Sequence, residues 1–155
     1  VISNINDEST FDKYFLRHIK YIDDWSLCDS FCNSIKQVSQ NKNKYFNMAL
    51  ELSLNEEEFI SRVGLITILS HFVEQPYIKE IFNLLNNIKS DKYYINMAEA
   101  WLICELYIKF PQHTEKFIKS NKLNKFTHNK AISKIRESLR VSKEEKNYLN
   151  TLKRK

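Results

Sequence analysis

The amino-acid sequence predicts an all-α protein, and its composition and its residue pattern support this. The chain has 155 residues but only one glycine and two prolines, so it holds few of the residues that hairpin turns require. No stretch shows the alternation of apolar and polar residues, bounded by turn signals, that is typical of strands. Apolar residues recur instead at helical spacing. A chain of this length also suits one domain, residues 1–155, with its own core.

Capping residues place the expected helices of the first half. Ser9 and Thr10 can cap a first helix, and Asp23 with Asp24 ends it and caps a second. Asn55 and the glutamates after it open a fourth helix, where negative charge suits the N-terminal end of the helix dipole. The first four helices are therefore expected at residues 9–22, Trp25 to Val38, Lys44 to Leu54, and residues 55–73.

Prolines and caps also separate the helices of the second half. Pro76 ends the fourth helix, Pro111 follows the sixth, and Ser142 with Glu145 forms a capping box for the last. The expected helices are residues 77–88, 91–110, 112–121, Thr127 to Val141, and residues 143–152. Such pairs of antiparallel helices predict an α-solenoid of HEAT-like repeats, and a single compact helical bundle is the alternative architecture.

The sequence predicts a protein without membrane spans, metal or cofactor. No apolar run is long enough to cross a bilayer and no signal peptide precedes the first helix, so we expect a soluble protein of the cytoplasm. The three cysteines, Cys28, Cys32 and Cys104, agree with a reducing compartment. Cys28 and Cys32 have no matching pair of zinc ligands, so we interpret them as buried structural thiols.

The segment from Asp24 to Cys32 carries the first candidate site. In a helix that begins at Trp25, an apolar stripe of Leu27, Phe31, Ile35 and Val38 would face the core. Trp25 and Asp29 lie one helical turn apart on another face, so an aromatic ring and a carboxylate would be displayed together. The alternative is that the tryptophan fills a gap at the helix start and the aspartate is a solvated surface charge.

Two further residues stand out in the middle of the chain. Trp101 belongs to a helix with almost no polar face, which predicts that this helix is central and that Trp101, taken alone, belongs to the core. Arg62 shares a helix face with Ile66 and other apolar residues, and a buried arginine needs a partner. A structural ion pair and a ligand-binding role, for which phosphate would suit the planar guanidinium, are equally supported.

The positive charge is concentrated in the last third of the chain. Residues 1–108 contain ten Lys and Arg against fifteen Asp and Glu, whereas residues 109–155 contain fourteen against four. Four of these cations are expected within one helix: Lys130, Lys134, Arg136 and Arg140. Such a segment is typical of contact with a nucleic-acid backbone, and a solvated lysine-rich surface is the alternative.

Several of these stretches resemble the bacterial DNA alkylation repair enzymes of the AlkC/AlkD type. The resemblance covers nearly the whole chain and rests on motifs in the same order: residues 25–29, 62–66, 93–101 and 126–138. It implies an α-solenoid of HEAT-like repeats with a basic, concave DNA-binding surface. By motif, Trp25 and Trp101 resemble the two tryptophans of the family's cleft, Asp29 its catalytic aspartate and Arg62 its phosphate-binding arginine.

The resemblance implies a monomeric glycosylase that removes cationic N3- or N7-alkylated purines from double-stranded DNA without metal or cofactor. Two points limit what can be carried over from the family to this chain. The family's N-terminal helices have no counterpart before Val1, and some members keep the fold without the excision activity. The runner-up hypothesis is therefore a non-catalytic HEAT-like module that binds damaged or branched DNA, or a protein partner, through the same surface.

Overall fold

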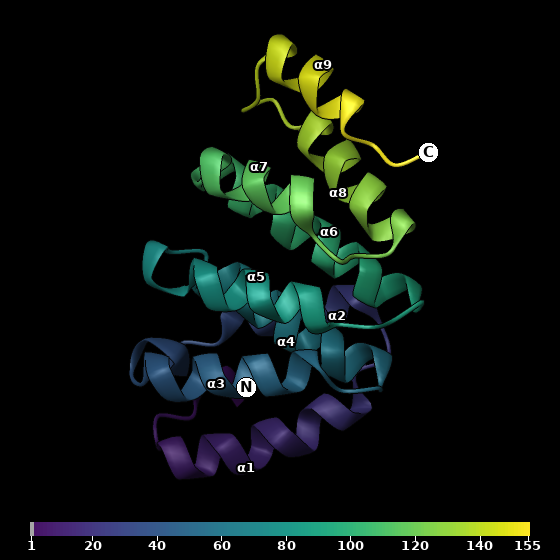
Figure 1. Ribbon diagram of the computed structural model, residues 1–155. Helices are drawn as coiled ribbons and strands as arrows, with labels where there is room; N and C mark the ends of the chain where they lie inside the picture. Colours follow the sequence, from purple (N-terminus) through teal and green to yellow (C-terminus); the bar gives the residue numbers. More distant parts are fainter. Residues whose placement is uncertain (1) are drawn as a thin grey trace. The chain divides into compact units, whose positions relative to one another are not determined.

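The computed structural model describes residues 2–155, and in this range it contains α-helices and short 3-10 helices but no strand (Figure 1). The contacts divide the chain into two units, one ending at Phe72 and the other beginning at Val73. The all-α prediction is confirmed. The prediction that residues 1–155 act as one domain stays a prediction. Within the described range, none of the helices has the length and apolar character needed to cross a membrane.

The first unit contains four α-helices, and of their predicted boundaries only the start of the second, at Trp25, is confirmed. The fourth begins at Glu58, with Glu57 as its cap, rather than at Asn55. The first helix is capped by Asp7, whose carboxylate accepts a hydrogen bond of 2.8 Å from the backbone N–H of Thr10, so Ser9 and Thr10 lie inside the helix. Asp24 caps the second helix as predicted. That helix ends at Ser34 rather than Val38, and the third begins at Lys42. The elements are η1 (Ile2–Asn4), α1 (Glu8–His18), η2 (Ile19–Tyr21), α2 (Trp25–Ser34), η3 (Gln37–Ser39), α3 (Lys42–Ser53) and α4 (Glu58–His71).

Helix α4 lies at the centre of the first unit and packs against both α2 and α3. It is buried around its whole circumference from Ser61 to Ile68. Gly64 explains the closeness of α3, because a Cβ atom added at this position would lie 2.6 Å or less from backbone atoms of Ala49 and Ser53. The single glycine of the chain therefore permits the close packing of these two helices.

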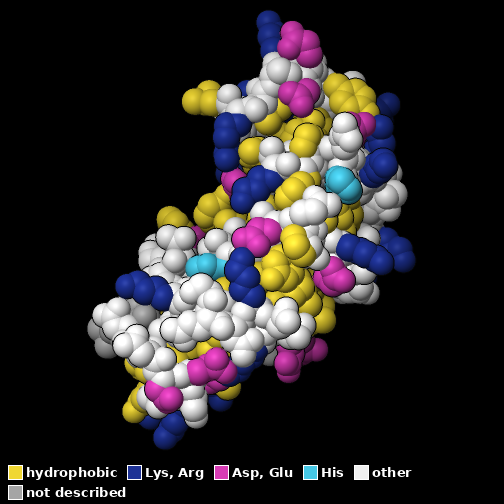
Figure 2. Space-filling view, turned by 90° about the vertical axis from the view of Figure 1, so that its left-hand side faces the viewer, with side chains coloured by type: hydrophobic (Ala, Val, Ile, Leu, Met, Phe, Trp, Pro, Cys, Tyr) yellow, Lys and Arg dark blue, Asp and Glu magenta, His cyan; other side chains and the backbone are white. Residues whose placement is uncertain are grey.

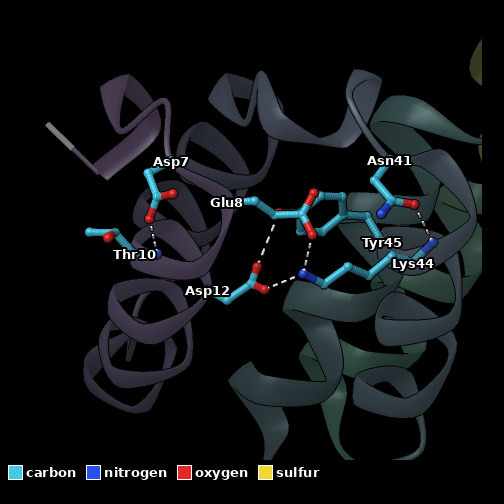
Figure 3. A network of polar contacts seen from close by, with 7 residues as sticks. All are labelled: Asp7, Glu8, Thr10, Asp12, Asn41, Lys44 and Tyr45. Atoms are coloured by element: carbon cyan, nitrogen blue, oxygen red, sulfur yellow. Dashed lines mark hydrogen bonds and ion pairs between the residues drawn. The ribbon is translucent and has the colours of Figure 1, made fainter.

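A polar network joins α1 to α3 (Figure 3). The Lys44 ammonium group donates to the carboxylates of Glu8 and Asp12, and the Tyr45 hydroxyl donates to the other oxygen of Asp12 at 3.0 Å. These carboxylates raise the pKa of Lys44 above its ordinary value. A charge shared between two acidic partners fixes the relative rotation of the two helices while the Tyr45 ring lies in the core.

The apolar stripe predicted for α2 is wrong in its rotation. The fully buried residues of this helix are Cys28 and Cys32, while Leu27 is exposed. Ile35 and Val38 are buried, but they follow the end of the helix and so do not extend its stripe. One residue along a helix corresponds to a rotation of about 100°. The two cysteines are buried thiols, as predicted. Because Cys28 rather than Leu27 faces the core, the buried face of α2 is turned by about one residue, and the neighbouring Asp29 lies at its edge.

The second unit contains five α-helices. The capping box at Ser142 and Glu145 is confirmed, with both reciprocal hydrogen bonds present. The predicted helix from Thr127 to Val141 lies instead at Lys125–Glu137, so Arg140 is in the turn that follows it. The elements are η4 (Gln75–Tyr77), α5 (Ile78–Asn87), α6 (Tyr93–Lys109), α7 (Pro111–Ser120), α8 (Lys125–Glu137) and α9 (Lys143–Thr151).

Helix α6 is the central helix of the second unit and packs against α7 and α8, while α8 also contacts α9 (Figure 1). Ten residues of α6 are buried, which agrees with the predicted central position. The placement of Trp101 in the core, which rested on the helix pattern alone, is wrong, because this residue is 37% exposed. The helix is apolar on nearly every side, so its sequence pattern did not show which residue faces outward.

Candidate functional site

The first unit brings Asp29 and Arg62 together in a two-pronged ion pair. Arg62 Nε donates to Asp29 Oδ1 at 2.9 Å, and Arg62 Nη2 donates to Asp29 Oδ2 at 2.8 Å. The two residues are 33 positions apart in sequence and come from α2 and α4. Parallel hydrogen bonds of this kind fix both the distance and the plane of the carboxylate. Sequence reasoning named both residues, and the structure shows that they contact each other.

Burial differs between the two partners of this pair. Arg62 is only 5% exposed, within the run of buried residues of α4. The Asp29 side chain keeps 17% of its surface exposed, because it lies at the edge of the buried face of α2. A buried guanidinium requires a negative partner, and Asp29 provides it. Of the two roles considered for Arg62, the structural ion pair is therefore present. The contact of Arg62 with phosphate stays a prediction.

The exposed Trp25 lies one helical turn before Asp29. It is the first residue of α2 and is 51% exposed. Asp24 holds this helix start in place, since its carboxylate accepts hydrogen bonds from the backbone N–H groups of Ser26 and Leu27. The start of α2 therefore carries an exposed aromatic ring and, one turn later, a fixed and partly accessible carboxylate.

The thiol next to Asp29 is not suited to act as a nucleophile. A hydrogen bond with Cys32, together with burial, raises the pKa of Cys28 far above its ordinary value. Cys32 in turn donates to the backbone oxygen of Val63. A thiol that stays protonated is a poor nucleophile, so the reactive groups of this cluster are the carboxylate and the ring.

In the second unit, Trp101 and Tyr93 are the exposed large aromatic residues of α6. Both side chains are exposed, in contrast to the ten buried residues of the same helix. Trp101 is therefore accessible to a ligand from the surface of its own unit.

The four cations predicted to contact DNA have different surroundings in the second unit. Arg140 forms an ion pair with Glu105 of α6, and Lys134 pairs with Glu137 on its own helix. Arg136 Nε donates to the backbone oxygen of Lys146, which ties α8 to α9. Lys130 lines a hollow in the surface of α8. On the face shown in Figure 2, lysine and arginine side chains lie scattered among hydrophobic and acidic ones.

Sequence reasoning missed a buried acidic residue in α6. Glu99 is 2% exposed, and its Oε1 atom has no hydrogen-bond partner among the described residues. Burial raises the pKa of Glu99 to about 8, against a smaller opposing attraction from Lys89. The sequence does contain a signal for this burial, because Glu99 lies in a helix that has no polar face on which it could be exposed. Its position makes it a source of pH-dependent stability rather than a surface charge.

We expect the stability of the protein to fall as the pH rises from about 5 to about 8. In this window the native state keeps the Glu99 proton while the unfolded chain, with a pKa near 4.5, has lost it. The stabilisation is therefore complete below pH 4.5 and is lost as the pH rises through 8. Glu99→Gln should flatten this dependence and should be the more stable protein at pH 9.

Urea unfolding at pH 6, 7, 8 and 9 measures this effect. Glu144→Gln, at an exposed position in the first turn of α9, is the matched control and should keep the wild-type slope. Equal slopes for wild type and Glu99→Gln would contradict the assignment of the pH dependence to Glu99.

The histidines and acidic groups of the described residues form no cluster of three or more that could hold a metal ion. His128 is buried, and burial lowers its pKa. Its ring nitrogens lie 2.9 Å from the backbone oxygen of Leu152 and 3.1 Å from the side-chain nitrogen of Asn121. A neutral ring satisfies both contacts, with Nε2 donating and Nδ1 accepting, so His128 connects three segments of the second unit.

Comparison with known proteins identifies a family. The family model described as DNA alkylation repair enzyme matches residues 2–135 of the chain. The matched range contains Trp25, Asp29, Arg62 and Trp101, while Arg136 and Arg140 lie beyond its end. No curated protein and no solved structure matches the chain.

Proposed function

Since the chain belongs to the DNA alkylation repair enzyme family, we propose that it is a DNA glycosylase that hydrolyses the N-glycosidic bond of cationic N3- or N7-alkylated purines. The observation that carries this proposal is the Asp29 carboxylate, which two hydrogen bonds from Arg62 hold in place and which remains partly exposed beside Trp25. Double-stranded DNA that contains such a base is the proposed substrate.

The alkylated base makes a strong general acid unnecessary. Alkylation at N3 or N7 gives the purine a positive charge, and the bond to the sugar breaks with its electron pair moving to the base. The base leaves neutral, while positive charge develops at the anomeric carbon as in sugar hydrolysis. The chemical task of the protein is therefore to stabilise this cationic sugar and to supply water to it.

Asp29 is suited to both parts of this task. A carboxylate fixed before the reaction stabilises developing positive charge without reorganisation at the moment of bond cleavage. One of its oxygens can also accept a proton from the attacking water, whose oxygen forms the new bond to the anomeric carbon. The products are the free alkylpurine and an abasic site. Arg62, as the partner that holds the carboxylate, is a positioning residue in this scheme, and its phosphate contact belongs to the same proposal.

The remaining predicted residues would bind the substrate and take no part in breaking or forming bonds. Trp25 and Trp101 would offer aromatic faces to the sugar and the cationic centre, each contributing about 0.5–2 kcal/mol. Lys130, Lys134, Arg136 and Arg140 would contact the DNA backbone.

We also propose that the helices form solenoid repeats. The packing within each unit supports this, because α2 and α3 both contact α4, and α7 and α8 both contact α6.

Replacing Trp25 with alanine should reduce base release about two- to thirtyfold, because it removes one cation–π contact. The free energy of unfolding should stay within about 0.5 kcal/mol of the wild-type value, since the ring is half exposed. Release of free 7-methylguanine from methylated duplex DNA, separated by chromatography, measures the effect.

Tyr21→Ala is the matched control, because it removes an exposed ring from the segment just before α2 and should leave release unchanged. An equal loss in both variants would argue against a specific role of Trp25. A folded wild-type protein that binds DNA but releases no base would favour the non-catalytic binding module over the enzyme.

A further inference from the structure

We propose that the second unit carries a separate binding site for an unpaired nucleotide of single-stranded DNA, on the outward face of α8 beside Tyr93 of α6. The site is a shallow hollow of about 580 Å³, lined by Lys125, Phe126, Asn129, Lys130 and Ser133. Four of these residues follow the spacing of one helix face, from Phe126 to Ser133. The inference rests on the proposed DNA substrate but concerns residues outside the Asp29 site.

Two lysines give the hollow a positive charge that the protein does not neutralise. Among the residues described by the structure, neither Lys125 nor Lys130 forms an ion pair with a carboxylate, whereas Lys134 and Lys119 pair with glutamates on their own helices. Arg140 is likewise paired with Glu105. A cation without an internal partner can neutralise a ligand phosphate without losing a protein contact.

An exposed aromatic pair lies at one end of the hollow. The rings of Phe126 and Tyr93 have centroids 6.2 Å apart, and Tyr93 also makes an edge contact with Tyr94 at 5.3 Å. Phe126 and Tyr93 each expose about half of their side chains. Such rings offer flat apolar faces at the surface, and every nucleobase can stack on them irrespective of sequence.

The polar side chains in the wall of the hollow are already occupied. The Asn129 amide donates to the backbone oxygen of Arg154 and accepts from its backbone N–H at 2.9 and 2.8 Å. The Ser133 hydroxyl accepts from Lys153 at 3.0 Å. These bonds stabilise the wall and leave few of its groups free to read base edges, so a ligand meets mainly the ring of Phe126 and the two lysines.

This combination specifies the chemistry of the ligand. Unneutralised ammonium groups select an anion, and the adjacent exposed ring selects a flat, unstacked aromatic group on the same molecule. A nucleotide of single-stranded DNA has both, whereas a base inside a duplex keeps its faces covered by its neighbours. Because the wall offers few free hydrogen-bonding groups, we expect little preference among the four bases.

The affinity for a fluorescein-labelled octathymidylate, compared with an octamer of abasic sites that has the same phosphates, tests this site directly by fluorescence anisotropy. The wild-type protein should bind the thymidylate more tightly. Phe126→Leu should weaken its binding about five- to hundredfold and abolish the preference over the abasic octamer, because leucine keeps apolar volume but offers no stacking face. Equal affinity of the wild type for both oligonucleotides would overturn the proposal.

Two control variants separate stacking and local charge from general effects. Tyr14→Leu removes an equally exposed ring from α1 and should leave binding unchanged. Lys130→Gln should weaken binding more than Lys116→Gln, which removes the same charge from an exposed position on α7. Equal losses within either pair of variants would overturn the proposal.

The result of these binding experiments does not depend on whether the protein releases alkylated bases. A protein that releases alkylpurine but whose Phe126→Leu variant keeps full preference for the thymidylate would retain the proposed function and lose this site. A protein that releases no base but shows the Phe126-dependent preference would lose the proposed function and retain the site.

Discussion

Asp29→Asn is expected to lower the rate of alkylpurine release at least about a hundredfold, the size of effect that follows when a preorganised electrostatic group is removed from a transition state. Asparagine keeps the shape of the side chain but carries no charge to stabilise the cationic sugar. Chromatographic measurement of released base with protein in excess over DNA reports the chemical step. Asp23→Asn, at an exposed position just before the cap of the same helix, should release base at the wild-type rate.

The same substitution is expected to destabilise the fold, and the two effects can be separated. Asp29→Asn leaves the buried Arg62 without its carboxylate, which should cost about 3–5 kcal/mol in the free energy of unfolding. The double variant Asp29→Asn with Arg62→Gln removes the buried positive charge as well and should recover part of that stability. Its base release should stay lost. A double variant that recovers stability and activity together would show that Asp29 serves folding rather than catalysis.

Gly64→Ala is expected to destabilise the protein by about 3 kcal/mol or more, because the new methyl group would overlap backbone atoms of α3. Those atoms belong to Ala49 and Ser53 and cannot move unless the whole helix shifts. In an exposed helix interior the same change would stabilise by about 1 kcal/mol, so the sign of the effect is diagnostic. Thermal unfolding should show a loss of roughly 10 °C.

Ser70→Ala, at a half-buried position of the same helix, is the matched control for Gly64→Ala and should change stability little. A Gly64→Ala protein that is as stable as the wild type would contradict the close approach of α3 to α4.

Local sequence signals predicted the parts of this fold that depend on neighbouring residues. The caps at Asp24 and Ser142 were found because a side chain that bonds the first turn of a helix does so irrespective of the rest of the protein. The start of α1 was misplaced because Asp7, Ser9 and Thr10 are all competent caps, and only the geometry shows which one is used.

The rotation of helices about their axes could not be predicted in the same way. In α2 the small cysteines face α4, and the larger Leu27 faces outward, which reverses the order that hydrophobicity alone suggests. In α6 the continuous apolar pattern left no polar face by which to orient the helix, so this pattern alone placed Trp101 in the core, whereas the motif resemblance placed it in a cleft. Both errors arise because tertiary packing, rather than helical periodicity, selects the buried face.

In the candidate site, too, single residues were predicted from the sequence, whereas their contacts appear only in the structure. Asp29 and Arg62 were each recognised as unusual from their own helices, but their direct contact joins residues 33 positions apart and appears only in the structure. Glu99 could have been noticed in the sequence as a polar residue of an apolar helix, but only the structure shows that Glu99 is buried whereas Glu105 of the same helix is partly exposed.

Release of free 7-methylguanine from a methylated duplex by the wild-type protein, beside the Asp29→Asn variant, tests the proposed function most directly. We predict release by the wild type well above the spontaneous rate, no comparable release by the variant, and no release of uracil, a neutral base, from a duplex of the same sequence that contains uracil. A folded wild-type protein that binds the duplex yet leaves the methylated base in place, or an Asp29→Asn variant as fast as the wild type, would contradict the account.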